Sequence, residues 1–233
     1  MCGRFVTVKT RAEQDHVDAI LALDPDFFQR PNWRDFLFFN VAPTQIVQAI
    51  RDVGGKRESF DARFGLLPAW AKEASFASRT FNARMETVAE KPSFRNAFKS
   101  RRALGPALGY YEWQTVGKVK TPYFVYLPDT MITFACLYED NSRWGASMTI
   151  ITAPAPERMQ WLHDRIPVIM PPNLRDAWLD PSIDSPDEVA AILQDAVDNQ
   201  PELSWYEVGK AVGNPRNQGP ELMEPVASQG SLL

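Results

Sequence analysis

Cys2 follows the initiator Met1, and its position gives it a chemistry that an internal cysteine lacks. Aminopeptidases that remove an initiator methionine accept small side chains at the next position, so we expect Cys2 to begin the mature chain. It would then carry an α-amine with a pKa near ~8 and a thiol with a pKa near ~8.5 on adjacent carbons. Such a 1,2-aminothiol attacks an aldehyde with nitrogen to give a Schiff base, then closes with sulfur to a thiazolidine. The alternative is that Cys2 is a small apolar residue at the start of a strand, since free cysteines are often buried.

Three other residues are candidates for proton transfer or for positioning. Glu112 lies in an aromatic stretch, Tyr110 to Trp113, where loss of water would raise a carboxyl pKa and suit a general acid or base. His163 is the one histidine in a plausible site loop, and Asn82 can orient a nucleophile or a carbonyl by hydrogen bonds. The alternatives are an outward-facing strand glutamate, a packing or capping histidine, and an asparagine that serves a turn.

Arginines and tryptophans in the same regions favour a nucleic-acid ligand. Arg4, Arg84 and Arg165 can hold phosphates by bidentate hydrogen bonds, and Trp70 and Trp113 can stack on unpaired bases. Residues 79–102 carry seven basic side chains and two acidic ones, although the whole chain has a net charge of −4. The functional interpretation is that these residues form a basic face that binds a polyanion. The structural interpretation is that the charged residues only form solvated faces of the protein.

Composition excludes several function classes. Two cysteines and two histidines are too few to indicate a zinc site or a disulfide framework, and Cys136 is expected in the core. No phosphate-binding or calcium-binding loop motif occurs, so we expect neither a metal nor a cofactor. No apolar run reaches the roughly 18 residues of a membrane span, and the N-terminus lacks the basic region and apolar run of a signal peptide. These features predict a cytoplasmic protein, associated with the nucleoid in a bacterium, with no membrane partner.

The elements that must position these residues are many short strands and a few helices. We expect strands near residues 2–8, 36–39, 46–50, 60–64, 103–108, 110–114, 148–152, 166–170 and 204–208, and a hairpin formed by 123–127 and 131–137. Capping boxes at Thr10 and Ser185 predict helices to about Leu23 and Val197, and shorter helices are expected near 93–98, 157–163 and 173–179. The pattern favours one α+β domain, residues 1–226, around a curved, mostly antiparallel sheet, with a frayed tail at 227–233.

Six ordered blocks resemble the SOS-response-associated peptidase (SRAP) family, whose members shield abasic sites in single-stranded DNA. They are residues 1–5 (MCGRF), 40–43 (NVAP), 81–87 (FNARMET), 109–113 (GYYEW), 163–168 (HDRIPV) and 213–214 (GN). The resemblance implies a single SRAP-type domain around a β-barrel-like sheet with peripheral helices. It also implies a monomer whose partner is single-stranded DNA that contains abasic sites.

The same resemblance assigns roles to residues. Cys2 would form a thiazolidine with the ring-opened sugar aldehyde, Asn82 would position Cys2 and the sugar, Glu112 would transfer protons, and His163 would assist Schiff-base chemistry and its reversal. Arg4, Arg84 and Arg165 would hold flanking phosphates, while Pro43, Trp70 and Trp113 would lie against bases near the lesion. The family name also implies a self-processing peptidase, but only Met1 precedes Cys2 here.

Two other functions fit part of the pattern. Glutamine amidotransferases with an N-terminal cysteine also begin Met-Cys-Gly, and there Cys2 would be an acyl-transfer nucleophile. A non-catalytic single-stranded-DNA-binding module with a buried Cys2 is the other alternative. The protein can be incubated with abasic and with intact oligonucleotides and run on a denaturing gel. A covalent adduct with the abasic strand distinguishes covalent capture from these two functions.

Overall fold

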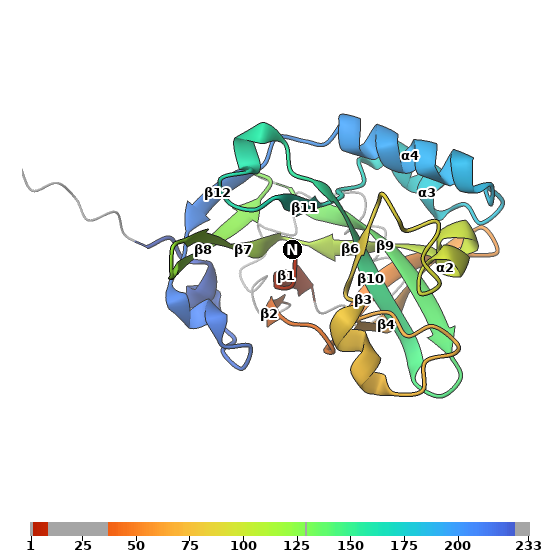
Figure 1. Ribbon diagram of the computed structural model, residues 1–233, viewed down its shortest axis with the longest axis horizontal. Coiled ribbons are helices and arrows are strands. Elements are labelled where there is room, and N and C mark those ends of the chain that lie inside the picture. The colour runs from red at the N-terminus through yellow and green to blue at the C-terminus, as the bar shows by residue number, and fades with distance from the viewer. Residues whose placement is uncertain (1, 9–36, 129, 227–233) are drawn as a thin grey trace, which may run out of the picture.

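The computed structural model describes residues 2–8, 37–128 and 130–226 (Figure 1). The helix predicted from Thr10 to Leu23 and the tail at 227–233 lie outside the described residues. Most of the described chain is organised as two sheets whose strands come from throughout the sequence.

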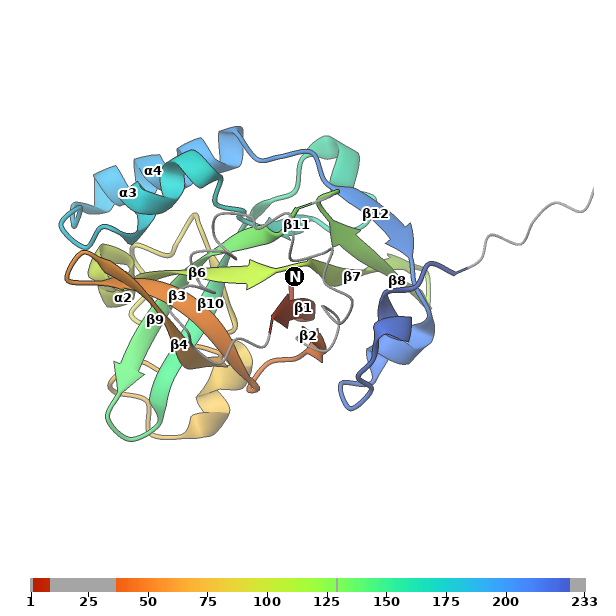
Figure 2. The same cartoon turned by 180° about the vertical axis from the view of Figure 1, so that it is seen from behind.

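The first sheet has five antiparallel strands in the order β12-β8-β7-β1-β2. Its strands are β1 (Phe5–Val8), β2 (Leu37–Val41), β7 (Gly109–Val116), β8 (Val119–Tyr126) and β12 (Ser204–Glu207). The short strand β1 pairs with β7 on one side and β2 on the other, so the start of the chain is held inside the sheet. Figures 1 and 2 show β1 near the middle of the molecule.

The second sheet has seven strands, five of which form a hydrogen-bonded ring. The strand order β10-β4-β3-β6-β9 returns to its start because β9 also pairs with β10. The strands are β3 (Ile46–Val53), β4 (Lys56–Phe64), β5 (Asn82–Arg84), β6 (Arg102–Ala107), β9 (Ile132–Asn141), β10 (Gly145–Pro154) and β11 (Arg165–Pro167). Only the pairings of β10 with β4 and β5 are parallel. The expected α+β class with a curved, mostly antiparallel sheet is therefore confirmed, although the strands divide into two sheets.

The helices are short and lie at the periphery, as Figure 2 shows for α3 and α4. The α-helices are α2 (Arg95–Ser100), α3 (Arg175–Leu179) and α4 (Pro186–Asp198), and the 3₁₀ turns are η3 (Ala74–Arg79), η4 (Glu157–Met159), η5 (Pro172–Leu174), η6 (Lys210–Gly213) and η7 (Pro220–Met223). Helix α4 buries Val189, Leu193 and Ala196, which recur on one helical face. Within the described residues, every helix is too short or too polar to cross a bilayer.

The chain passes from the second sheet to the first between β6 and β7, and Gly109 is the first residue of β7. A Cβ atom at Gly109 would lie 2.5 Å from both the Phe124 ring and the Val125 carbonyl oxygen, so no side chain fits there. This close approach lets β7 pair with β8 directly after β6 ends. It thereby fixes where the Tyr110 to Trp113 stretch lies.

Two local predictions are wrong. The hairpin expected from residues 123–127 and 131–137 does not form, because β8 pairs with β7 and β12 whereas β9 pairs with β6 and β10. Only an isolated bridge joins Leu127 to Thr130. The helix expected near 157–163 is the single turn η4, in a segment that follows Pro154 and Pro156. At the expected hairpin, long-range strand pairing decided what the segments flanking the turn became.

The C-terminal segment covers the outer strand β2 of the first sheet. The Gln218 side-chain oxygen accepts hydrogen bonds from the backbone amides of Phe39 and Asn40, and its amide nitrogen donates to the Asn40 carbonyl at 3.1 Å. The Gln218 side chain thus forms hydrogen bonds with backbone groups of β2 that a neighbouring strand could otherwise pair with. At the opposite edge, the Val226 amide donates to the Glu207 carbonyl on β12.

Candidate active site

Cys2 lies in a buried cluster to which both sheets contribute, and which we call the Cys2 cluster. Its members include Cys2, Phe5, Phe64, Tyr110, Val125, Phe134, Cys136, Ile150, Leu162 and Ile166. Each of the other candidate catalytic residues follows closely on a side chain that belongs to this cluster or packs against it. The structure therefore brings together segments that are up to 160 residues apart in the sequence.

The thiol of Cys2 is fully buried in the chain that carries Met1. Burial raises the pKa of this thiol well above its usual range, and the nearby Glu112 carboxylate raises it further. The Cys2 sulfur is therefore a neutral thiol at pH 7 and needs a base before it can attack. The effect of Glu112 on Cys2 places this carboxylate in the electrostatic environment of the thiol.

Glu112 and Tyr110 lie two positions apart on β7 and so share one face of the strand. Glu112 is 5% exposed, and its Oε1 atom accepts a hydrogen bond from the Trp113 backbone amide at 3.2 Å. Burial raises the pKa of Tyr110 well above its usual range, with further contributions from Cys2 and Glu112. A desolvated carboxylate thus lies beside a buried thiol and a buried phenol.

Tyr110 is a candidate residue that our sequence reasoning missed. Its hydroxyl is buried and has no hydrogen-bond partner among the described residues. A buried hydroxyl without a partner costs roughly 1–3 kcal/mol, so such a group often serves a function. Its position two residues before Glu112 was the available signal, since period 2 puts both side chains on the Cys2 side of the strand.

Asn82 begins β5 in the second sheet, directly after Phe81, which packs against the Cys2 cluster. It lies opposite Ile150 of β10, whose carbonyl accepts a hydrogen bond from Asn82 Nδ2 at 3.4 Å. Its Oδ1 atom is buried and has no partner among the described residues. The preceding Phe81 ring contacts Phe64 at 5.7 Å, and Phe64 contacts Phe5 at 5.2 Å. Asn82 therefore presents a buried acceptor on a strand that is packed against the start of the chain.

His163 lies between Leu162 and Ile166, both of which belong to the Cys2 cluster. Its Nδ1 atom accepts a hydrogen bond from the Arg165 backbone amide at 3.0 Å and lies 2.7 Å from an Asp164 carboxylate oxygen. The amide contact requires an unprotonated Nδ1, whereas the carboxylate stabilises a protonated one. The Asp164 side chain is 83% exposed, so its contact with His163 is screened by water.

Arg165 is directed into the protein, contrary to the expectation of an open phosphate clamp. Its guanidinium forms two hydrogen bonds with the Glu86 carboxylate, at 2.7 and 2.9 Å, and two more with Thr152. The residue is 7% exposed. A phosphate would have to compete with Glu86 for this guanidinium, so the geometry favours a role in joining β11 to the segment after β5.

Arg4 joins β1 to the C-terminal segment. Its guanidinium donates to Asn40 Oδ1 at 2.8 Å and to the carbonyls of Val212 and Gly213. Partial burial lowers the pKa of Arg4, which nevertheless remains charged at neutral pH. Arg4 is partly exposed and follows Cys2 by two residues. It can therefore add charge near the site while it anchors β1.

The remaining expected DNA contacts are surface residues. Arg84 is exposed and has no ion-pair partner in the part of the chain that the structure describes, and Trp70 is 53% exposed, with its ring against Phe76 at 5.2 Å. Pro43 precedes Thr44, which has a φ of 78°, the one positive φ of a non-glycine residue in the described ranges. Trp113 is partly buried and packs beside Tyr111 and Phe124. Arg84 and Trp70 are thus the most accessible of the expected contacts.

The basic segment 79–102 does not form one continuous face. Arg102 is 2% exposed and donates to backbone carbonyls of Phe98, Lys99, Trp178, Asp180 and Ile183. Arg101 pairs with Glu139 at 2.9 Å. Arg84, Lys91, Arg95 and Lys99 remain exposed and can contribute positive potential.

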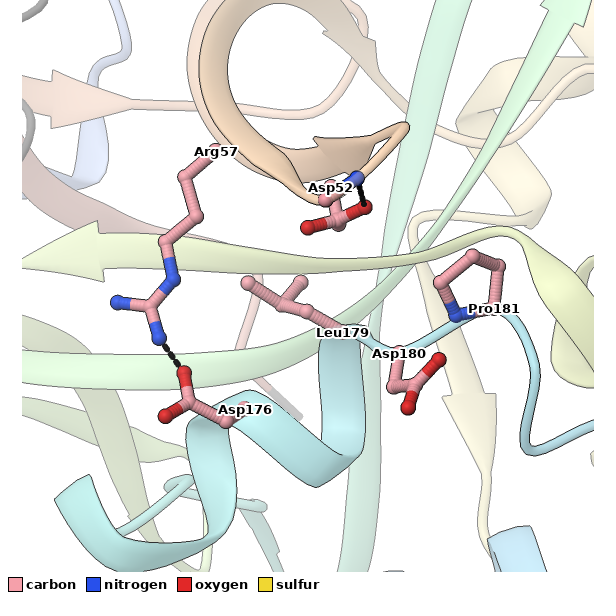
Figure 3. A pocket seen from close by; sticks show the side chains of 7 residues that line it. Asp52, Arg57, Asp176, Leu179, Asp180 and Pro181 are labelled. Atoms are coloured by element: carbon pink, nitrogen blue, oxygen red, sulfur yellow. Dashed lines mark hydrogen bonds and ion pairs between the residues drawn. The ribbon is translucent and has the colours of Figure 1, made fainter.

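A separate pocket of about 510 Å³ lies between the β3–β4 turn and helix α3 (Figure 3). It is lined by Asp52, Gly55, Arg57, Asp176, Leu179, Asp180 and Pro181, and Arg57 forms an ion pair with Asp176 across it. None of the residues expected at the site from the sequence lines this pocket. The described residues contain no cluster of histidine, cysteine and acidic side chains that could hold a metal ion.

Comparison with known proteins gives consistent matches over the whole chain. A sequence model of the SOS response associated peptidase (SRAP) family matches residues 1–215. The chain is 36% identical to abasic site processing protein YoqW of Bacillus subtilis, with 96% of this chain and 99% of that protein aligned. It is 35% identical to abasic site processing protein YoaM of the same organism, with 96% and 98% aligned. A crystal structure of a Bacteroides thetaiotaomicron protein shares the fold, with a TM-score of 0.69, 22% identity, and 95% and 99% of the two chains covered.

Proposed function

The chain belongs to the SOS response associated peptidase family, and we propose that it captures abasic sites in single-stranded DNA as a covalent thiazolidine on Cys2. The observation that carries the proposal is that Cys2 is buried near the Glu112 carboxylate, while Asn82 and His163 each follow directly a residue that lies in the Cys2 cluster or packs against it. Relatives named abasic site processing proteins support the choice of substrate.

The reaction begins when Met1 is removed and the Cys2 nitrogen becomes a primary amine. This amine attacks C1′ of the ring-opened sugar, and the aldehyde oxygen leaves as water after protonation, which gives an iminium. The Cys2 sulfur then gives up its proton and attacks C1′, which closes the thiazolidine. The net change is one aldehyde plus one aminothiol to one thiazolidine plus one water. Ring closure consumes the iminium, which would otherwise promote β-elimination and strand cleavage.

The neighbouring side chains supply proton transfer and positioning. Glu112 is near the Cys2 thiol and can take its proton as the sulfur attacks, which matters because burial keeps the thiol neutral. His163 can protonate the departing oxygen or return a proton during reversal. The buried Oδ1 of Asn82 can accept a hydrogen bond from the amine or from a sugar hydroxyl.

The proposed DNA contacts are made by exposed and partly exposed residues. Arg84, with Arg4 nearer to Cys2, neutralises phosphates beside the lesion, and Trp70 and Pro43 lie against flanking bases. Phosphate neutralisation makes the reversible encounter sensitive to salt, whereas a covalent adduct survives high salt.

A denaturing gel tests the proposal. The protein is incubated with a labelled single-stranded oligonucleotide that contains one abasic site, and with the same oligonucleotide without the lesion. We expect a heat-stable shifted band with the abasic strand alone. The Cys2→Ala variant keeps a terminal amine, so it should give an adduct only after borohydride reduction. A full yield of heat-stable adduct from Cys2→Ala would exclude the thiazolidine.

One observation favours a second candidate. Cys2 is fully buried, as expected for a cysteine that only packs in the core of a non-catalytic DNA-binding module. In that case the gel shows no adduct with either strand, while a native binding assay still detects the complex.

A further inference from the structure

Three aromatic side chains extend outward from the proposed reactive carboxylate. Tyr123 of β8 lies directly across from Glu112 of β7, so both side chains are on the same face of the first sheet. The Tyr123 ring contacts Trp161 at 5.0 Å with an interplanar angle of 86°, and Trp161 contacts Trp205 of β12 at 5.7 Å. We call Tyr123, Trp161 and Trp205 the aromatic row.

The outer members of the row are accessible to a ligand. Trp161 is 38% exposed and Trp205 is 36% exposed, whereas Trp178 is fully buried. The indole nitrogens of Trp144 and Trp178 donate to backbone carbonyls, but those of Trp161 and Trp205 have no partner in the described parts of the chain. The two surface indoles therefore do not act as internal hydrogen-bond anchors.

The row is fixed in place on the side of His163. Trp161 lies two residues before His163, and Leu162 between them is buried in the Cys2 cluster. Trp205 lies on β12, which pairs with β8, and its cross-strand partner is Val125, another member of the Cys2 cluster. Trp161 and Trp205 are thus each held by a buried neighbour, and the ring contacts run from Tyr123, which lies across from Glu112, to β12 at the edge of the sheet.

Charges beside the row argue for a ligand that presents rings rather than phosphates. Glu207 lies across from Tyr123 on β12, and the Asp164 side chain is 83% exposed. The nearby Arg158 forms an ion pair with Glu202 at 2.7 Å. The charges named here are two exposed carboxylates and one cation that is already paired, so the row offers stacking area while phosphates must be held elsewhere, as by the exposed Arg84.

We propose that Trp161 and Trp205 form a base-stacking subsite for unpaired nucleobases next to the captured abasic nucleotide. The inference rests on the proposed function, since the DNA strand that enters the site is what brings bases past Glu112 and His163. Stacking on aromatic rings tolerates any base sequence, as capture of a lesion in any sequence requires. Trp70 would serve bases elsewhere on the strand, so the two aromatic surfaces would separate the two flanks of the lesion.

Reversible binding to an oligonucleotide without an aldehyde tests the subsite separately from the covalent step. The probe is a labelled single strand with one tetrahydrofuran abasic analogue, and binding is followed by fluorescence anisotropy. We expect Trp205→Ala and Trp161→Ala each to weaken binding by about tenfold, and Trp205→Phe to restore most of the loss. Val119→Ala is the matched control, because Val119 is an exposed apolar residue with 57% exposure and no ring.

Two further measurements identify stacking as the cause. Log affinity against log salt should keep the wild-type slope in Trp205→Ala, whereas Arg84→Ala should reduce that slope. Replacing the bases on one side of the analogue by further tetrahydrofuran units should weaken wild-type binding and abolish the difference between wild type and Trp205→Ala.

The outcomes separate the subsite from the proposed function. If the Trp161→Ala and Trp205→Ala variants bind as tightly as wild type, the subsite is excluded even if the abasic strand gives a full heat-stable adduct, and the row would then suit a protein partner. If no adduct forms but the tryptophan variants still bind more weakly, the subsite stands and the thiazolidine chemistry falls.

Discussion

The guanidinium of Arg165 and the carboxylate of Glu86 form a two-point hydrogen-bonded pair, at 2.7 and 2.9 Å, 79 residues apart in the sequence. The pair connects β11, which follows His163, with the segment that follows Asn82. Two candidate catalytic residues are thus held by segments that one ion pair joins. Arg165 therefore connects the segments next to His163 and Asn82.

We expect Glu86→Gln to destabilise the fold by roughly 1–3 kcal/mol at neutral pH, because it leaves the buried Arg165 with a neutral partner. The hydrogen bonds from Arg165 lower the pKa of Glu86 below its usual 4.5. The contribution of the carboxylate is therefore complete above pH 4.5 and is lost as the pH falls through the lower folded value. Urea unfolding of both proteins should show a difference at pH 7 that shrinks in strong acid. Glu90→Gln, which changes an exposed carboxylate with no described ion pair, is the control.

Retention of Met1 should abolish covalent capture. A variant with lysine inserted between Met1 and Cys2 keeps its initiator methionine, because the aminopeptidase requires a small second residue. Its Cys2 has no free amine and remains a buried neutral thiol. Mass spectrometry should find Met1 absent from the wild type and present in the variant, and only the wild type should give a heat-stable adduct. An adduct of equal yield from the variant would rule out the amine as the attacking group.

Removal of the Tyr110 hydroxyl should change the rate of capture with little loss of stability. Tyr110→Phe keeps the ring contact with Phe134 at 6.3 Å and removes an oxygen that has no described partner, so the fold should be as stable or slightly more stable. We expect adduct formation to slow by about tenfold if the hydroxyl binds the reacting sugar or amine. Single-turnover gels across pH check this. Equal rates in both proteins at every pH would assign Tyr110 to packing alone.

Glu112→Gln should slow ring closure more than Schiff-base formation. The amide cannot take the proton of the Cys2 thiol, whose pKa is raised by burial. Borohydride-trapped iminium should therefore accumulate while the heat-stable product forms about 100-fold more slowly. Raising the pH should recover part of the rate, because the thiol then ionises without a base. If iminium and product decline in parallel, Glu112 acts before the iminium forms.

Arg102 should be among the most important residues for stability. It is 2% exposed and donates to five backbone carbonyls that link the end of α2 to the end of α3. Burial lowers its pKa to about 10, so it stays charged at pH 7. We expect Arg102→Met to cost about 2–4 kcal/mol in denaturant unfolding. The exposed Arg95→Met should stay within about 0.5 kcal/mol of wild type.

The sequence was enough to identify the candidate catalytic residues, but it did not show which partners the arginines bind. Cys2, Asn82, Glu112 and His163 were identifiable from residue type and from the order of short motifs. Cys2 belongs to the Cys2 cluster, and each of the other three follows within two positions a residue that lies in the cluster or packs against it. Arg165 looked equally available for phosphate, because its partner Glu86 is distant in sequence and a local pattern cannot show the pairing. Arg102 lies in a run of basic residues, and its burial and its distant backbone partners could not be predicted from the local sequence either.

Strand positions were predictable where local pattern and long-range pairing agreed. Gly54 and Gly55 have positive φ angles of 63° and 81° and make the turn between β3 and β4, the strands expected near 46–50 and 60–64. The segment around Pro128 also looked like a hairpin turn, yet β8 and β9 belong to different sheets. Tyr123, Trp161 and Trp205 meet only because β8 pairs with β12, a contact that no local window contains.

The contact between Gln218 and β2 has a consequence for edge-to-edge association. Among the described strands, β2 and β12 are the outer strands of the first sheet. Gln218 occupies backbone groups of β2 and Val226 donates to β12, so the C-terminal segment covers both edges of the first sheet against a strand of a second chain. Loss of this segment would favour aggregation by edge-to-edge pairing even if the chemistry at Cys2 were untouched.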